Sequence, residues 1–334
     1  SESDTGKKLK VVVTGINPKT VSIGQINAEI FFGNSGEYVL PSSVTFDDAH
    51  VYCVTKISEN AFKGNSSLGK VSIPEGITQI DKYAFEGSGL TSVIIPKTVT
   101  YIGMGAFANI PNLKIAMFPD CATDLGEKVL GKTPVVEEVV IYPSGVTLDL
   151  ENVKTIYGAL KLGVEGSKVK NIKLYPAYKV SDAIANGSLS VTPIISTDGI
   201  VCQLNAVPNS GYYVEDVLYY GFVLEAVNGS YSLALPSISY SPESGGINLA
   251  TIVFSANFAQ EGKKYNVSFD TCENGTATAS SYSAVLNENV TLSAIPSAGY
   301  RFKEWSIVSG RGSLSSTTNS ETTYTMGTSN VKLK

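Results

Sequence analysis

The sequence is poor in the side chains that most enzymes and metal sites use. It has one histidine, one tryptophan and four cysteines in 334 residues, and 16% of its residues are charged. Soluble domains usually have about one quarter charged residues, so Ser, Thr, Asn and Gly must supply much of the polar surface. Lys plus Arg number 25 against 30 Asp plus Glu, and no basic run occurs. We therefore expect no nucleic-acid partner.

Long apolar runs are also missing. No stretch approaches the ~20 residues that a membrane helix needs, so we expect no transmembrane segment in this chain. The first eight residues are polar. They fit a cytosolic start or a mature start after removal of an export signal, and the residues alone do not separate the two.

The sequence contains no combination of residues that would complete a catalytic or metal-binding site. Any Ser-His-Asp or Cys-His arrangement would have to use His50, the only histidine. His50 follows Asp47 and Asp48, but no second histidine or spaced cysteine pair completes a metal site, and a turn with an Asp cap is the favoured reading. The Ser-Gly-Arg-Gly segment at residues 309–312 is no G-x-S-x-G motif, and its glycines predict a hairpin turn. We predict no catalytic residue, no metal and no cofactor, and hence no enzyme.

Three segments of the chain repeat one pattern with a period of 22 or 23 residues. Each has an Ala-Phe pair, whose phenylalanines are Phe62, Phe85 and Phe107, followed by a short apolar strand that ends at proline. Apolar residues two apart on a strand point to one face, and proline ends the strand because it has no N–H donor. One coil cannot bury both of its walls, so the coils must stack into a solenoid. The repeats cover residues 57–74, 80–96 and 102–119.

Weaker copies surround these three. We expect about five coils, of which the last two are degenerate, because terminal repeats must present an atypical face. Residues 136–143 and 169–176 keep the strand pattern, and residues 156–160 echo the Ala-Phe segment with one deletion. Strands of an N-terminal cap are expected at residues 11–14, 29–32 and 51–54.

A second repeat occupies the C-terminal part. The run L-N-A-V-P-N-S-G-Y at residues 204–212 matches L-S-A-I-P-S-A-G-Y at residues 292–300, with a constant offset of 88. Two small β domains of one type are the natural reading, with a linker near 179–188 and a joint near 260–263. The first copy departs from the second, since Val217 stands where Trp305 would fall.

The cysteines are predicted to be buried free thiols. Cys53 and Cys121 share a repeat phase three coils apart, which is about 14 Å at ~4.8 Å per coil. A disulfide tolerates at most about 7 Å between Cα atoms. Cys202 and Cys272 fall in different small domains.

The repeat resembles the BspA-type (Treponema-type) leucine-rich repeat. The pattern I-x-x-x-A-F-x-x-x-x-x-L-x-x-V-x-I-P, followed by I/V-T-x-I, occurs at residues 57–80 and again at 80–102. The family often has Cys between the Ala-Phe pair and the Leu, where this chain has Asn65, Ser88 and Ile110. The segment L-x-A-x-P-x-x-G-Y-x-F-x-x-W at residues 292–305, followed by Thr-Met, resembles the divergent internalin B-repeat.

These resemblances imply a mainly β chain: a right-handed leucine-rich-repeat solenoid with an N-terminal β cap, then two small β-rich domains that are Ig-like or β-grasp-like. They also imply export to the cell surface or the extracellular space. The expected domains are a cap at 1–50, the solenoid at 51–178 (the repeat array), a small β domain at 188–260 and a B-repeat-like domain at 263–334.

The best binding clue is the outward side of the array's strands. Ile94, Ile115, Met117 and Val140 (the outer row) lie between inward-facing residues and should be neighbours on adjacent strands. An exposed apolar patch usually marks a contact with a partner. The alternative is that the cap or the first small domain packs there.

Three functions follow. The first is a surface adhesin or binding protein with the array as its platform, and the second is a structural spacer with no ligand. The third is an accessory module of a surface hydrolase system. The resemblance implies a host matrix protein, a cell-surface protein or a glycan as the partner, and we expect the chain to be a monomer.

Overall fold

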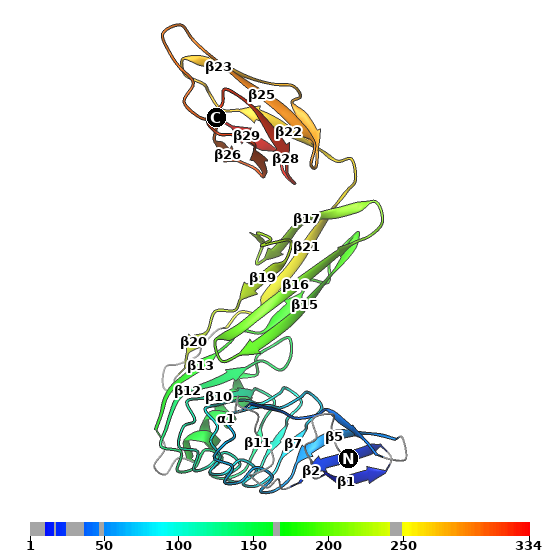
Figure 1. Ribbon diagram of the computed structural model, residues 1–334, viewed down its shortest axis with the longest axis vertical. Coiled ribbons are helices and arrows are strands. Elements are labelled where there is room, and N and C mark those ends of the chain that lie inside the picture. The colour runs from blue at the N-terminus through cyan, green and yellow to red at the C-terminus, as the bar shows by residue number, and fades with distance from the viewer. Residues whose placement is uncertain (1–10, 17, 25–36, 47–49, 163–167, 241–248) are drawn as a thin grey trace. The chain divides into compact units, whose positions relative to one another are not determined.

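The computed structural model describes most of the chain and shows it to be mainly β, as predicted (Figure 1). None of the helices it describes is long and apolar enough to cross a membrane. Two compact units are formed. Unit 1 comprises Ser1–Lys179, Thr192–Gln203 and Ser232–Val253, and unit 2 comprises Val180–Val191, Leu204–Tyr231 and Phe254–Lys334. The described residues are 11–16, 18–24, 37–46, 50–162, 168–240 and 249–334.

One wall of unit 1 is a set of short parallel strands, one per coil. Its inward side chains, such as Val93, Ile95 and Phe118, are almost fully buried in one continuous apolar core, as the repeat predicted. Proline follows or ends several of these strands. The strands are β6 (Lys70–Ser72), β8 (Ser92–Ile94), β10 (Ile115–Pro119), β12 (Val135–Tyr142) and β13 (Lys168–Leu174), with β3 (Glu37–Val39) paired to β6 and β20 (Ile238–Ser239) paired to β13.

The opposite wall is a second parallel sheet with the same one-strand-per-coil spacing. Inward residues such as Ile57, Ile80 and Ile102 stack above one another because successive strands pair in register. The strands are β2 (Lys19–Ile23), β5 (Val51–Ile57), β7 (Gln79–Ile80), β9 (Tyr101–Ile102) and β11 (Asp124–Leu125), and two antiparallel strands, β1 (Val11–Ile16) and β4 (Ser43–Thr45), join β2 and β5. The strand expected at 29–32 lies outside the described residues.

Aromatic stacking runs along the axis of the array. The ring of Phe85 lies 5.0 Å from that of Phe62 and 5.2 Å from that of Phe107, with planes nearly parallel. The residue before each Ala takes a left-handed conformation, as Asn60 and Tyr83 do. Lys128 has the same conformation two periods after Tyr83, before Val-Leu rather than Ala-Phe. This turn belongs to the fourth coil, whose strand was expected at 136–143 and is β12. The sequence pattern did not show the turn itself, because both marker residues changed.

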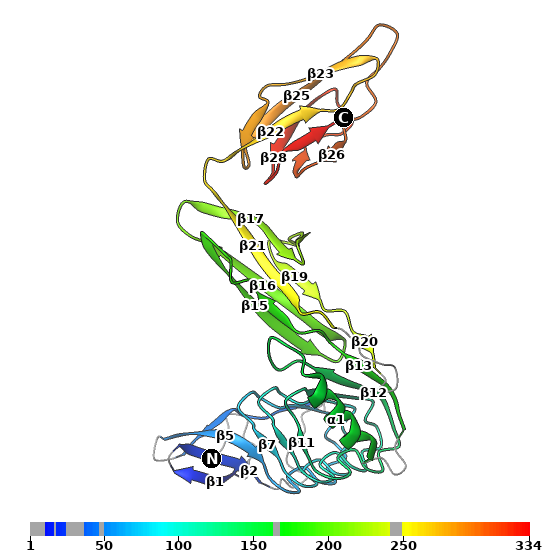
Figure 2. The same ribbon diagram turned by 180° about the vertical axis from the view of Figure 1, so that it is seen from behind.

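The expected Ala-Phe echo at residues 156–160 is wrong, because this segment is helical. It lies in α1 (Leu150–Leu162), at the closing end of the array (Figure 2). Asp149 caps the helix by accepting hydrogen bonds from the backbone N–H groups of Glu151 and Asn152, at 3.0 and 3.1 Å. Val153, Ile156 and Leu160 follow helical spacing and are buried in the core of unit 1.

The C-terminal residues 263–334 (the C-terminal domain) form two small sheets around their own core. Trp305, Tyr324 and Leu292 are buried there. The strand order is β24 (Ser283–Val285), β22 (Lys264–Phe269), β29 (Val331–Leu333), β26 (Ile307–Ser309) in one sheet and β23 (Gly275–Ala279), β25 (Asn289–Pro296), β28 (Glu321–Met326), β27 (Gly312–Leu314) in the other.

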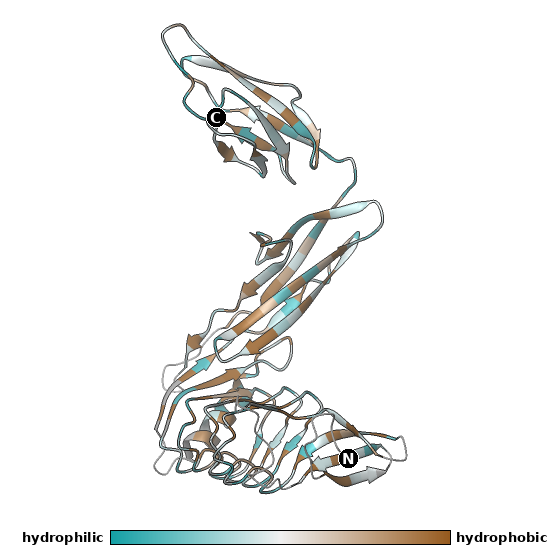
Figure 3. Cartoon of the chain, viewed as in Figure 1, coloured by the Kyte–Doolittle hydropathy of each residue, from teal (hydrophilic) through white to brown (hydrophobic). Residues whose placement is uncertain are grey.

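The preceding strands also form a pair of sheets, one of four strands and one of three, in place of the two four-stranded sheets. The two copies share one turn: Tyr212 N–H donates to the Asn209 carbonyl and Tyr300 N–H donates to the Ser297 carbonyl, each at 3.0 Å. The strands of both copies carry bands of hydrophobic and hydrophilic residues (Figure 3). The strand order is β14 (Tyr178–Val180), β21 (Ile252–Gln260), β17 (Tyr212–Tyr219), β18 (Phe222–Leu224) and β15 (Gly187–Ser196), β16 (Gly199–Pro208), β19 (Tyr231–Ala234).

The two units do not follow the predicted domain boundaries. Unit 1 takes Thr192–Gln203 and Ser232–Val253 from within the predicted domain at 188–260. In addition, β2, which lies in the region predicted as a cap, pairs in parallel with β5 of the predicted solenoid. The boundaries at 50, 178 and 260, like the right-handed sense of the solenoid, stay predictions.

All four cysteines are free thiols, but the expectation that all are buried is wrong. Cys53 and Cys272 are exposed, and Cys53 points outward because its neighbour Val54 points into the core. Cys202 is buried, and this burial raises the pKa of its thiol to about 12. Cys121 is half-buried and donates to the Lys97 carbonyl at 2.9 Å.

Candidate interaction face of the repeat array

The outer row lies on three adjacent parallel strands of unit 1, namely β8, β10 and β12. Met117 on β10 pairs with Ile94 on β8 and with Val140 on β12. Ile115, two residues before Met117, pairs with Ser92 and with Glu138. Three of the four residues are therefore consecutive across the sheet, and Ile115 stands in the neighbouring line on the same side.

The outer row is only partly open, which corrects the expectation of an exposed patch. Met117 and Val140 are 1% and 2% exposed, whereas Ile94 and Ile115 are half-buried. Met117 and Val140 therefore cannot meet a partner in this structure. Of the four candidate residues, the structure leaves Ile94 and Ile115 accessible in part.

Tyr142 is one physical reason for this burial. It lies two residues beyond Val140 on β12, so both point to the outer side. Its hydroxyl donates to the carbonyl of Ile95, two strands away, so the ring must cross the sheet. Burial raises the pKa of Tyr142 well above its usual value, and the hydroxyl stays neutral. The apolar row is thus covered in part by a residue of the array itself.

A second cover comes from a distant part of the sequence. Pro193 and Ile195, at the end of β15 and within unit 1, line the same hollows as Tyr142. These residues belong to the predicted first small domain, so the alternative hypothesis, that this domain packs on the outer face, agrees better with the structure than an open face does. No local sequence pattern indicates this contact, because these residues lie more than 50 positions from the strands that they cover.

A hollow of about 490 Å³ remains between these covers and the first coils. Ile94 and Ile195 supply apolar surface, and Lys70 and Glu75 supply opposite charges. Ligand sites commonly occupy about 300–1,000 Å³ with apolar walls and a few polar groups. The hollow is lined by Lys70, Val71, Ser72, Ile73, Glu75, Ser92, Val93, Ile94, Pro96, Tyr142, Pro193, Ile195, Ser196 and Thr197.

A buried carboxylate binds the loop between β12 and α1, which follows Tyr142. Asp120, at the end of β10, is 2% exposed. It accepts hydrogen bonds from the backbone N–H of Ser144 at 2.8 Å, from the Ser144 hydroxyl at 2.5 Å and from the backbone N–H of Asp149 at 3.0 Å. Such a fully satisfied buried carboxylate holds a loop in one conformation. These bonds tie both ends of the loop between β12 and α1 to the end of β10.

The lining of the hollow includes neither histidine nor cysteine, and its titratable side chains are those of Lys70, Glu75 and Tyr142. Across the described ranges, no three His, Cys, Asp or Glu side chains gather to hold a metal. His50 is described, but Asp47 and Asp48, its proposed companions, lie outside the described residues. Shape and surface chemistry, rather than reactive groups, characterise this face.

Two family comparisons match the chain. Residues 23–151 match the BspA type leucine rich repeat region in six copies, and residues 265–334 match the divergent InlB B-repeat domain. Both resemblances inferred from the sequence are confirmed. The repeats begin at residue 23, earlier than the predicted array. No curated protein matches the chain.

Several solved structures are similar to part of the chain. The T. pallidum leucine rich repeat protein TpLRR is 14% identical over 48% of this chain and 97% of its own, with a TM-score of 0.30. The pneumococcal vaccine antigen PcpA is 18% identical over 40% of this chain and 47% of its own, with a TM-score of 0.28. A Bacteroides ovatus leucine-rich repeat protein is 19% identical over 42% of this chain and 62% of its own, with a TM-score of 0.20. The chain spans about half the length of PcpA.

Proposed function

We propose that this chain is a non-catalytic binding protein of the cell surface or the extracellular space, with the repeat array as its interaction platform. The observation that carries the proposal is the hollow beside Ile94 on the outer side of the array. The BspA-type repeats and the B-repeat domain support it, because both are consistent with surface protein-binding modules. The partner class that we propose is a host matrix protein, a cell-surface protein or a glycan.

The chemistry of the hollow supports an extended or branched partner rather than a small charged one. Ile94 gives an apolar centre, while Ser72 and Ser92 on neighbouring strands offer hydroxyl groups that both donate and accept hydrogen bonds. Lys70 and Glu75 contribute one charge of each sign, so no strong field selects for one sign of ligand. Recognition would then depend on shape and on hydrogen bonds.

An array of purified matrix proteins and glycans tests this proposal. The wild-type chain should be retained by at least one class, and Ile94→Asp should weaken that retention about tenfold, which corresponds to about 1.4 kcal/mol. The matched control is Val227→Asp, a change at an exposed valine of unit 2, which should bind like wild type. Thermal unfolding should be the same for all three proteins, because Ile94 is only half-buried.

Equal retention of Ile94→Asp and wild type would contradict the hollow as the binding site. A large fall in melting temperature would mean that Ile94 is an internal contact. Retention by no matrix protein or glycan would favour the second function, a structural spacer, which the burial of Met117 and Val140 already supports. That the chain is a monomer remains a prediction, which light scattering of the purified protein checks.

A further inference from the structure

The segment Gly310-Arg311-Gly312 is built to hold one arginine in one place. The two glycines have φ angles of 99° and 149°, which favour glycine. A Cβ on Gly310 would lie 2.3 Å from the Asn330 carbonyl oxygen, and a Cβ on Gly312 would lie 2.2 Å from the Tyr324 hydroxyl. No other residue fits either position, so the backbone around Arg311 is fixed by its surroundings.

Hydrogen bonds to the Arg311 backbone complete this support. The Tyr324 hydroxyl donates to the Arg311 carbonyl at 2.6 Å, and the Arg311 N–H donates to the Ser329 hydroxyl at 2.9 Å. Tyr324 is buried in the core of the C-terminal domain. The backbone of Arg311 is therefore tied to that core. Its side chain also donates to the Thr328 hydroxyl of the same domain, at 3.2 Å.

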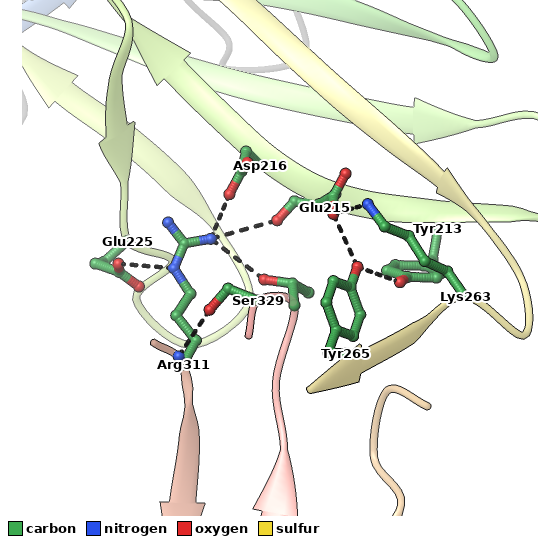
Figure 4. A network of polar contacts seen from close by, with 9 residues as sticks. Tyr213, Glu215, Asp216, Glu225, Lys263, Tyr265, Arg311 and Ser329 are labelled. Carbon is green, nitrogen blue, oxygen red and sulfur yellow. Dashed lines mark hydrogen bonds and ion pairs between the residues drawn. The ribbon is translucent and has the colours of Figure 1, made fainter. Parts of the chain in front are cut away.

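The side chain reaches the hairpin of β17 and β18, within unit 2 (Figure 4). Its Nη1 donates to the Asp216 carboxylate and to the Glu215 carbonyl, the latter at 3.4 Å, and its Nε lies 3.5 Å from a carboxylate oxygen of Glu225. The planar guanidinium can serve several acceptors at once, which an ammonium does less well. One arginine of the C-terminal domain thus engages three residues that precede that domain.

A β-bulge in β17 positions the groups that accept hydrogen bonds from Arg311. The register between β17 and β21 shifts between Val214 and Asp216, so Glu215 is the extra residue of a β-bulge. Bulges commonly re-aim side chains and backbone groups at functional places. Here the bulge presents the Glu215 carbonyl to Arg311 and its carboxylate to a second cluster.

That second cluster joins the same two parts of unit 2. The Tyr265 hydroxyl donates to the Glu215 carboxylate at 2.9 Å and shares a hydrogen bond of 2.5 Å with the Tyr213 hydroxyl. Lys263 forms an ion pair with the same carboxylate. Tyr213, on β17, also packs against the apolar core of the C-terminal domain. Polar and apolar contacts therefore act together at this junction.

The contacts are particular to the junction and do not belong to the 88-residue repeat. At that offset Val223 corresponds to Arg311, and Ala177 corresponds to Tyr265. Neither can make the polar contacts of its counterpart. A repeat feature would appear in both copies, so this set of residues serves the one place where the two copies meet.

We propose that Arg311 and the Glu215 cluster clasp the C-terminal domain onto the β17–β18 hairpin, so that unit 2 moves as one stiff body. Without the clasp, the short turn at residues 260–263 would be the connection between them. With it, the side chains on both sides of the turn resist bending. This gives the Gly-Arg-Gly segment a purpose beyond that of a hairpin turn.

Distances between two spin labels test the clasp. Ser190→Cys and Thr278→Cys place labels at exposed positions that correspond in the two copies, in a full-length chain that also carries Cys53→Ser, Cys121→Ser and Cys272→Ser. Double electron–electron resonance should give one narrow distance distribution. Arg311→Ala should widen it at least twofold. Lys303→Ala should leave it unchanged, because the Lys303 side chain is 89% exposed and forms an ion pair with the adjacent Glu304.

Two results would overturn the proposal. One is a parent distribution already as broad as that of Arg311→Ala, and the other is an Arg311→Ala distribution as narrow as the parent's. The fluorescence of Trp305, the single tryptophan, reports whether the C-terminal domain stays folded. If Arg311→Ala unfolds that domain, Asp216→Asn decides instead, since it removes the acceptor charge from outside the domain and should also widen the distribution.

Discussion

The repeat array and the C-terminal domain are stabilised in different ways. In the array, equivalent residues meet at each coil, as in the stack of Phe62, Phe85 and Phe107. The resulting core is continuous from Val21 to Leu174. The C-terminal domain has a separate core around Trp305 and Tyr324. Its junction with the β17–β18 hairpin depends on contacts that occur once in the described chain.

The comparison shows what repetition does. A contact that recurs with a fixed period appears several times in the sequence, and each copy supports the same reading. It also spreads stability over many equivalent residues, so that each coil depends on its neighbours. A contact made once leaves no such pattern, however important it is to the structure.

The largest effect is expected from removing the central ring of the stack. Phe85→Ala should lower the free energy of unfolding by about 3–5 kcal/mol, because it leaves a cavity between two coils that cannot collapse independently. Phe222→Ala is the control, since Phe222 is 68% exposed in unit 2, and it should cost less than about 0.5 kcal/mol. Urea unfolding followed by circular dichroism measures both. Similar costs for the two changes would contradict a stacked core.

A smaller change in the free energy of unfolding, of opposite sign, is expected at a buried polar residue in the core of the array. Asn65 is buried, and neither polar atom of its side chain has a hydrogen-bond partner in the described part of the chain. One and two coils later, Ser88 and Ile110 occupy this phase. Asn65→Leu should raise the free energy of unfolding by about 1–3 kcal/mol, because it removes an unpaired buried amide. The same urea titration measures the gain.

Thr133 is the matched control for Asn65, since it occupies the same phase in the fourth coil. Its hydroxyl donates to the Phe107 carbonyl at 3.1 Å and accepts from the Ile110 N–H at 3.4 Å. Thr133→Val should therefore lower stability by about 1 kcal/mol. If both changes destabilise the chain, hydrogen bonding does not explain the polar residues of this phase.

Much of the array could be predicted from the sequence. The period, the inward-facing Val and Ile residues and the phenylalanine stack follow from alternation along strands and from the repeat itself. The helix α1 was missed because Ile156, Ala159 and Leu160 fit a degraded repeat as well as a helical face. The strand of the fourth coil was predicted at 136–143, but its turn was missed because Val129 and Leu130 replace Ala-Phe while the backbone conformation is kept.

The candidate site was less predictable. The outer row was placed on the right strands, but its burial depends on Tyr142 and on Ile195, whose approach no local pattern shows. Arg311 was noted in the sequence only for its flanking glycines. Its partners Glu215 and Asp216 lie almost 100 residues away, on a bulge that alternation does not predict. Single long-range contacts are the part of a fold that periodicity cannot supply.

Native-state hydrogen exchange tests the central claim most directly, namely that the array is one cooperative body and the C-terminal domain another. The backbone amides of Phe62, Phe85 and Phe107, each bonded to the next coil, should exchange with one common opening free energy and one denaturant dependence. Amides between β25 and β28 should follow a different isotherm. Coil-by-coil opening of the array, or a single isotherm for both regions, would contradict the account.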